Sequence, residues 1–237
     1  MTDINPSLLD GIATTRAIRR YRDEPIPTED LNRILFAASR APQGSNRQGF
    51  RFLVLRDGPR AAQARALLGA AAQKHWDEKR VRDGYDTGSG SSAGTPKARM
   101  AATMEHFTDH FHEAPVLVVA CLWLHREASL TMGGSIFPAV QNLLLAARAL
   151  GYGGVITGWH DHCEVELRAV LGLPSPEKVA IAAIVPLGRP VGGHGPVRRR
   201  PLDQIVYEDV WEQPAAWAQD PQGTRFTSAG PPSGLRI

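Results

Sequence analysis

Cysteine is scarce in this sequence of 237 residues. Cys121 lies in an apolar run and Cys163 in a histidine-rich segment, and the chain has no other cysteine. Two cysteines without paired spacing predict neither a disulfide framework nor a zinc knuckle. Free thiols fit a reducing compartment, so we expect a cytoplasmic protein.

Long apolar runs are also missing. The longest, residues 115–124, is far shorter than the roughly 20 residues that a membrane-spanning helix needs. Residues 1–15 have no apolar core of the kind found in a signal peptide. Lysine and arginine (27) barely exceed aspartate and glutamate (24), and the only basic cluster is Arg198–Arg200. We therefore expect neither a membrane partner nor a nucleic-acid partner.

The usual motifs of nucleophilic and nucleotide-binding enzymes are absent as well. The chain has no Gly-x-Ser-x-Gly elbow, no Walker loop and no Gly-x-Gly-x-x-Gly turn after a strand. Histidines crowd two segments, 106–112 and 160–162, but no cysteine or carboxylate completes a recognisable ligand spacing, so no metal is predicted. Chemistry is then expected to come from a bound organic cofactor.

The composition, 43% hydrophobic and 22% charged, is that of a globular protein. We expect one domain over residues 1–212, followed by a Pro/Gly-rich tail, 213–237. Apolar spacing and breakers predict helices at 6–12, 28–38, 60–76, 134–150 and about 164–171, and strands at 51–56, 115–124, 154–158 and 178–187. The Gly/Ser-rich stretch near 84–96 is predicted to be a mobile loop or lid.

Two arginine-bearing segments lie far apart in the sequence, at Thr15–Tyr21 and at Arg198–Pro201. The planar guanidinium fork suits phosphate oxygens. Taken alone, each run is more typical of a solvated face. Their significance depends on the segments between them.

Four segments, in this order, resemble the FMN-dependent nitroreductase family over nearly all of residues 12–211. The first is Thr15–Tyr21, and the second is Ala41–Phe50, which precedes a strand. The third is the part of the predicted helix 134–150 that starts at Gln141, together with the strand end that follows it, Ile156–Trp159. The last comprises Val185–Pro190, then Arg199–Leu202 and a late tryptophan, Trp211. Each motif alone is weak, whereas four in order are specific.

The resemblance implies an α+β, three-layer fold with a central mixed sheet flanked by helices, in an intertwined homodimer with two FMN molecules between the subunits. It places Arg16 and Arg199 at the FMN phosphate, with Arg198 or Arg200 as helpers. Arg19 should lie by the N1 and O2 edge of the flavin, where a cation stabilises the reduced ring. Thr15 and Ala17 belong to the same cofactor-binding segment but replace the family's arginine and serine.

The resemblance assigns further cofactor contacts to three places. The strand end is expected to pass the flavin N5 with its backbone, and it consists of Ile156, Thr157 and Gly158. A loop is expected to reach the flavin from the other subunit, through Pro42, Gln43, Gly44 and Asn46. Gln73 stands where the family often has a flavin-contacting amide.

The implied activity is the reduction of nitroaromatics, quinones or related electron-poor small molecules, with NADPH or NADH as electron donor. Hydride passes through the flavin N5 in a ping-pong cycle, so no catalytic side chain is expected. The substrate mouth is predicted near 84–96, with Phe107 and Phe111 behind it. Alternatives are a dehalogenase or a flavin-cleaving synthase of the same family, or a non-catalytic protein that sequesters FMN or senses redox state.

Overall fold

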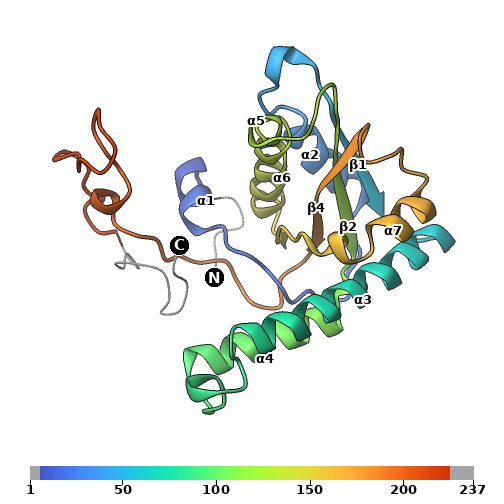
Figure 1. Cartoon of the computed structure of the whole chain (residues 1–237), viewed down its shortest axis with the longest axis horizontal. Coiled ribbons are helices and arrows are strands. Elements are labelled where there is room, and N and C mark those ends of the chain that lie inside the picture. The colour runs from blue at the N-terminus through green and yellow to red at the C-terminus, as the bar shows by residue number, and fades with distance from the viewer. Residues whose placement is uncertain (1–5, 225–237) are drawn as a thin grey trace.

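A four-stranded sheet lies between two layers of helices in the computed structural model, which describes residues 6–224 (Figure 1). The strand order is β1-β2-β4-β3. The strands are β1 (Phe50–Leu55), β2 (Val116–Trp123), β3 (Gly153–Gly154) and β4 (Val179–Gly188). The α+β, three-layer architecture expected from the sequence is therefore confirmed.

Strand β2 supplies both hydrophobic cores because successive side chains point to opposite faces of a sheet. Leu117, Val119 and Cys121 pack into one core. Val116, Val118, Ala120 and Leu122 pack into the other. Its run of apolar residues is therefore that of a strand covered on both faces.

Each face of the sheet has its own helices. One face is covered by α2 (Thr28–Ala38), α5 (Leu130–Gly133) and α6 (Phe137–Ala149). The other is covered by α3 (Pro59–Arg82), α4 (Pro96–Asp109) and α7 (Glu164–Leu171). Helix α1 (Leu8–Thr14) contacts α6 at the edge of this body, and the segment after residue 195 stands away from it (Figure 1). Five short 3-10 turns complete the described chain: η1 (Gly44–Asn46), η2 (Gly88–Gly90), η3 (Phe111–Glu113), η4 (Trp159–His162) and η5 (Leu202–Gln204).

The expectation of a mixed sheet is wrong for the described chain, because all three strand pairings are antiparallel. Two helices, α3 and α4, connect β1 to β2, and α4 packs back against α3. The chain therefore returns to the end of the sheet where β1 finished. Arg65 joins the two strand ends there, since its guanidinium donates to the carbonyls of Leu55 (2.8 Å) and Pro115 (3.1 Å).

The predicted strand 154–158 forms only in part. Thr157 and Ile184 exchange both backbone hydrogen bonds, at 3.0 and 2.9 Å. In an antiparallel ladder the next bonded pair in this register is Val155 with Pro186. Proline has no N–H to donate, so the ladder is interrupted and β3 is only two residues long.

The helical predictions succeed where the apolar spacing is clear. Helices α2 and α7 have the predicted bounds, and the predicted helix 134–150 is mainly α6, followed by Gly151 at φ +81°. Residues 130–149 are long and apolar enough to cross a membrane by length and composition alone. In the fold, however, α6 buries its apolar face against the sheet as a core helix.

Other boundaries differ from the predictions. Helix α3 continues to Arg82, and α4 was not expected at all. The first predicted helix, 6–12, forms as α1 from Leu8, and the Ser7 side chain caps it. In the predicted tail, Ala215 and Ala218 are buried against the preceding segment, so its described part has a small packed centre. Residues 225–237 of that tail lie outside the described residues.

Candidate functional site

A cavity of about 320 Å³ opens at the end of β3, where the chain turns into η4. Arg19 reaches it from the N-terminal segment, and Ile156, Thr157 and Gly158 form its strand side. The remaining lining residues come from α3, α4, Val155 and η4: His75, Met104, Phe107, Val155, Trp159, Asp161 and His162. The structure thus brings together four of the residues predicted from the sequence. We call this the strand-end cavity.

Backbone pairing with the sheet holds Arg19 in place. The N–H of Ile18 donates to the carbonyl of Gly154 at 3.0 Å, and Tyr21 forms a bridge with Pro190. The Tyr21 hydroxyl donates to the carbonyl of Ile18 at 2.6 Å. The segment 18–21 therefore runs along the open edge of β3, and Arg19 extends from it into the cavity.

The Arg19 guanidinium is half-buried, and burial lowers its pKa. No hydrogen bond or ion pair joins it to a carboxylate among the described residues. A desolvated cation without an acidic partner favours a ligand that carries negative charge or acceptor atoms. On the opposite side, a Cβ built on Gly158 would have no atom within 4 Å, so a planar ligand can approach this backbone closely.

Two histidines in the strand-end cavity were not singled out as part of the cofactor site. His75 of α3 and His162 of η4 place Nδ1 and Nε2 3.3 Å apart. The His75 ring also lies 5.9 Å from the ring of buried Trp159. His75 could have been found because it lies two residues beyond the predicted Gln73. The only feature of the sequence that pointed to His162 was its place in a histidine-rich segment.

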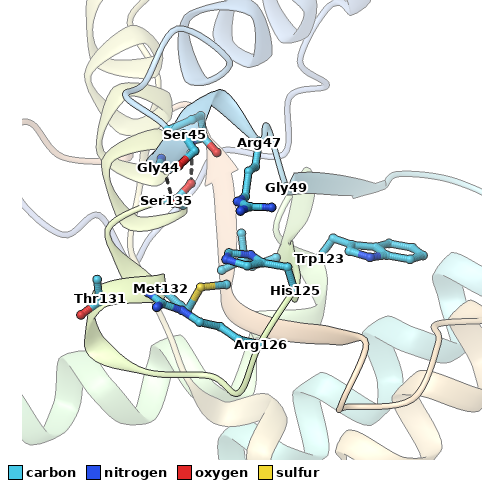
Figure 2. A pocket seen from close by; sticks show the side chains of 12 residues that line it. Gly44, Ser45, Arg47, Gly49, Trp123, His125, Arg126, Thr131, Met132 and Ser135 are labelled. Atoms are coloured by element: carbon cyan, nitrogen blue, oxygen red, sulfur yellow. Dashed lines mark hydrogen bonds between the residues drawn. The ribbon is translucent and has the colours of Figure 1, made fainter.

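A second pocket, of about 240 Å³, lies beside the predicted loop 42–46 (Figure 2). Gln43 and Gly44 line it, together with Arg47 and Gly49. The other wall comes from the end of β2, the turn after it and α5, and includes Trp123, His125, Arg126, Thr131, Met132 and Ser135. Pro42 and Asn46 lie on the same loop but do not line the pocket. We call this the loop pocket.

The loop backbone is held in an unusual conformation. Ser45, Asn46 and Gln48 all have positive φ angles, between 49° and 52°. Such residues cost free energy unless their surroundings fix them, and they are frequent at ligand sites. The Gln43 Nε2 donates to the Ser135 carbonyl at 2.7 Å, whereas its Oε1 is buried without a hydrogen-bond partner.

The loop pocket is positively charged. Figure 2 shows the Arg47 guanidinium close to the His125 ring, with Trp123 directed away from both. Burial and then the nearby charges of Arg47 and Arg126 lower the pKa of His125. No carboxylate lines this pocket. The arrangement therefore favours an anionic ligand.

The arginines predicted to hold a phosphate lie in a third region. The N–H of Gly195 donates to the carbonyl of Thr14 at 3.0 Å, so the segment that leads to Arg198–Arg200 runs beside Thr15 and Arg16. A Cβ at Gly195 would lie 3.9 Å from Arg16 Nη1. Arg16, Ala17 and Arg199 are exposed, and the Thr15 hydroxyl is buried without a partner.

Some predicted positions fall elsewhere. Gln73 is exposed and lines neither cavity, because two residues turn an α-helix by about 200° and so carry it away from the face of His75. Phe107 is buried but lines the strand-end cavity, whereas Phe111 is buried in the core and does not. No residue of 84–96 lines this cavity, and the substrate mouth expected there stays a prediction.

One group of potential metal ligands lies near η4, where atoms of His160, Asp161 and Glu164 approach within 4.8 Å of one another. The sequence predicted no metal because no carboxylate stands at a recognised ligand spacing, although Asp161 and Glu164 lie close to His160 in space. Glu164 and His160 nevertheless contact other groups of the protein. Glu164 accepts hydrogen bonds from Arg168, and His160 Nε2 lies 3.1 Å from the Ile181 carbonyl. We assign no metal to this group.

Residues 12–189 match the profile described as the nitroreductase family. An NADH dehydrogenase of Thermus thermophilus is 34% identical over 203 residues, which cover 81% of this chain and 90% of that protein. An iodotyrosine deiodinase of Thermotoga neapolitana is 26% identical, over 84% of this chain and 95% of the relative. A nitroreductase of Desulfovibrio desulfuricans, solved in complex with FMN, superimposes with a TM-score of 0.61 at 28% identity, covering 87% of this chain and 99% of the other.

Proposed function

The chain belongs to the nitroreductase family, and from this premise we propose that it is an FMN-dependent oxidoreductase that uses NADH or NADPH to reduce electron-poor small molecules. Nitroaromatics and quinones are acceptors of this kind. One observation carries the proposal. The half-buried Arg19, which has no carboxylate partner, faces the same cavity as the open backbone of Gly158.

We assign the flavin ring to the strand-end cavity. When bound there, FMN supplies the hydride chemistry that no side chain of the protein provides. Arg19 then stabilises the negative charge that reduction places on the ring. The backbone at Ile156, Thr157 and Gly158 orients the ring, and the missing Cβ of Gly158 leaves room for it.

The FMN phosphate is assigned to Arg16 and Arg199, with Arg198 or Arg200 as helpers. Two observations support this assignment. The segments that carry these arginines run side by side, and the buried Thr15 hydroxyl has no hydrogen-bond partner within residues 6–224. A phosphate or ribityl oxygen would satisfy that hydroxyl, whereas Ala17 has no polar group to offer.

We further propose that two chains form a homodimer in which the loop Pro42, Gln43, Gly44 and Asn46 reaches the FMN of the partner subunit. Large apolar side chains that are exposed on the described chain support a partner subunit. Trp211 and Trp217, at 80% and 67% exposure, stand on the segment that leaves the body of the fold. Leu8, Leu9 and Ile12 are exposed on α1. Solvated apolar groups of this size favour burial between subunits. A cytoplasmic location remains part of the proposal.

The loop pocket is proposed to bind the phosphates of the nicotinamide dinucleotide. Arg47 and Arg126 line it without any carboxylate, and neither has an ion pair elsewhere among the described residues. In solution, ADP-ribose should compete with the electron donor. An Arg126→Gln variant should weaken that competition about tenfold, because a charge-assisted hydrogen bond contributes about 1.5–3 kcal/mol. Unchanged competition would remove this part of the proposal.

The proposed function is tested by the colour of the purified protein and its response to electron donors. We expect a flavin absorption spectrum that NADH or NADPH bleaches in the absence of oxygen and that a quinone or nitroaromatic restores. Protein that neither carries nor takes up FMN would contradict the proposal. A flavin that neither nucleotide bleaches would favour an FMN-sequestering protein. Given the deiodinase relative, an iodotyrosine should be included among the acceptors.

A further inference from the structure

A hydrogen-bonded pair of histidines lies in the strand-end cavity. His75 comes from the middle of α3 and His162 from η4, and both are half-buried. Their ring nitrogens are 3.3 Å apart, which requires that one ring donates a proton and the other accepts it. Both histidines line the strand-end cavity, together with Arg19 and Gly158.

Reduction by hydride requires a proton as well. A neutral quinone or nitro compound that takes up a hydride gains two electrons and one hydrogen, and becomes an anion. One further proton on oxygen or nitrogen makes the neutral product. The NAD(P)H and FMN of the proposed function supply the hydride, but neither supplies this proton to the product.

We propose that the His75–His162 pair is the proton donor for the reduced acceptor. An N–H bond of the protonated pair breaks, an O–H or N–H bond forms on the acceptor, and the pair regains its proton from water. This inference rests on the proposed function, and it adds a catalytic site made by side chains to a reaction otherwise assigned to the flavin.

No other side chain in the cavity suits this role. Arg19 does not release its proton in proteins. The Thr157 hydroxyl already donates to the Ile184 carbonyl at 3.0 Å, and a carboxylate such as Asp161 is an acceptor when ionised. Imidazole is the side chain that both holds and releases a proton near neutral pH. The pair is thus the only donor of this kind among the residues that line the cavity.

The surroundings of the pair favour the release of its proton. Burial, followed by His162, Arg82 and Lys79, lowers the pKa of His75, while Glu78 opposes them. Arg19 and Asp161 face the same space from the N-terminal segment and η4. The hydrogen bond between the two rings gives a proton on one of them a direct path to the other.

The test uses two acceptors that differ in their need for protons. FMN-loaded His162→Gln and His75→Gln proteins are first reduced anaerobically and then mixed with a quinone or with ferricyanide, which takes electrons without protons. Reoxidation by the quinone should be about 100-fold slower than in the unmodified protein, the lower end of the scale of general acid catalysis. Reoxidation by ferricyanide should change less than about twofold, since it needs no proton donor.

The pH dependence gives a readout that a structural role would not move. In the unmodified protein, quinone reduction should slow as pH rises through the apparent pKa of the pair, because the protonated form is the donor. In the variants, the rate of quinone reduction should not show this fall with rising pH. A matched control replaces His106 and His110 by glutamine, since their rings also lie together, 4.2 Å apart, but outside the cavity. The control should behave as the unmodified protein.

Several outcomes would overturn the inference. These are equal slowing with both acceptors, no slowing with the quinone, or retention of the fall with rising pH in both variants. A second measurement needs no turnover. In FMN-free protein, nitrogen-15 NMR should detect a coupling between His75 Nδ1 and His162 Nε2 across their hydrogen bond, and its absence would contradict the pair. Failure of the proposed function itself is distinct, since the unmodified protein would then not bind FMN or be bleached by NAD(P)H.

Discussion

Arg65 illustrates how one side chain can fix the ends of two strands. Its guanidinium donates to five carbonyl oxygens, at 2.6–3.2 Å, which belong to Leu55, Arg56, His112, Ala114 and Pro115. Burial lowers the pKa of this arginine, yet the carbonyl partners compensate for the lost water. The sequence offered no signal for this role, because Arg65 stands in an ordinary Ala/Leu-rich helix.

Replacing Arg65 by alanine should lower the free energy of unfolding by about 2–4 kcal/mol, since several half-buried carbonyls lose a charged donor at once. Urea unfolding followed by circular dichroism measures this. Arg60→Ala, an exposed position on the same helix, is the matched control and should change stability by less than about 0.5 kcal/mol. Equal effects of the two substitutions would refute the role of Arg65.

The arginines assigned to the FMN phosphate give a prediction about binding. Arg16→Ala and Arg199→Ala should each raise the dissociation constant for FMN at least about tenfold, since each removes a charge-assisted hydrogen bond. Fluorescence quenching of FMN measures the constant. Both positions are exposed, so the thermal midpoint of the FMN-free protein should hardly change. Unchanged affinity in both variants would rule out this clamp.

His194 links stability to pH. Burial is the main cause that lowers its pKa, with Arg148 and Arg16 adding to it, although the Tyr152 carbonyl opposes them. Its Nδ1 is buried without a hydrogen-bond partner. Below about pH 6.5, the ordinary histidine value, the unfolded chain binds more protons than the folded one, so the free energy of unfolding should fall as pH drops.

Denaturation at several pH values between 5 and 8 measures this slope. His194→Gln should give a shallower slope over the window below pH 6.5, while part of the slope remains because burial also lowers the pKa of His75 and His106. An unchanged slope would show that His194 titrates alike in both states.

At the residue scale, the sequence motifs singled out strand-end positions that share one cavity, whereas no motif singled out the histidine pair. Arg19 and Gly158 belong to motifs, and the fold places them in one cavity. His75 and His162 are 87 positions apart. Only the packing of α3 against η4 joins them, and no local pattern encodes that contact.

Elements whose signal is local were predicted from the sequence, and those set by tertiary contacts were not. Helix α2 has its apolar residues at helical spacing, and β2 is a continuous apolar run. The short β3 depends on Pro186 of another strand, and the antiparallel order depends on the return of α4 along α3. Pairing partners are not visible in a single segment.

Close packing at β3 gives a prediction at this scale. A Cβ at Gly154 would lie 2.6 Å from the carbonyl oxygen of Pro186 and 2.7 Å from a Leu187 methyl. Because backbone must move to admit it, Gly154→Ala should cost about 1–3 kcal/mol of stability. Gly192→Ala, where a Cβ meets nothing within 4 Å, should change it by less than about 0.5 kcal/mol. Comparable unfolding curves for the two would contradict this account.

For the whole molecule, the α+β fold class follows from the sequence, whereas the proposed dimer rests on exposed apolar residues of the described chain. Sedimentation of the protein should give a homodimer at micromolar concentration. Trp211→Ser should shift it toward monomer, because this side chain is 80% exposed and would lose its burial in the partner. A control, Val165→Ser, removes an apolar group 78% exposed on α7, far along the chain from this segment. A monomer in the unmodified protein, or equal effects of both substitutions, would contradict the proposal.

Helices α3 and α4 form a hairpin whose two ends meet at one place on the sheet. Arg65 ties the end of β1 to the start of β2, so the excursion between them departs from and returns to one fixed point of the sheet. The far tip, with its Gly/Ser-rich turn around η2, can therefore gain or lose residues over evolution while the strand register stays the same. Related proteins can thus vary in the length and shape of this tip without any change to the sheet.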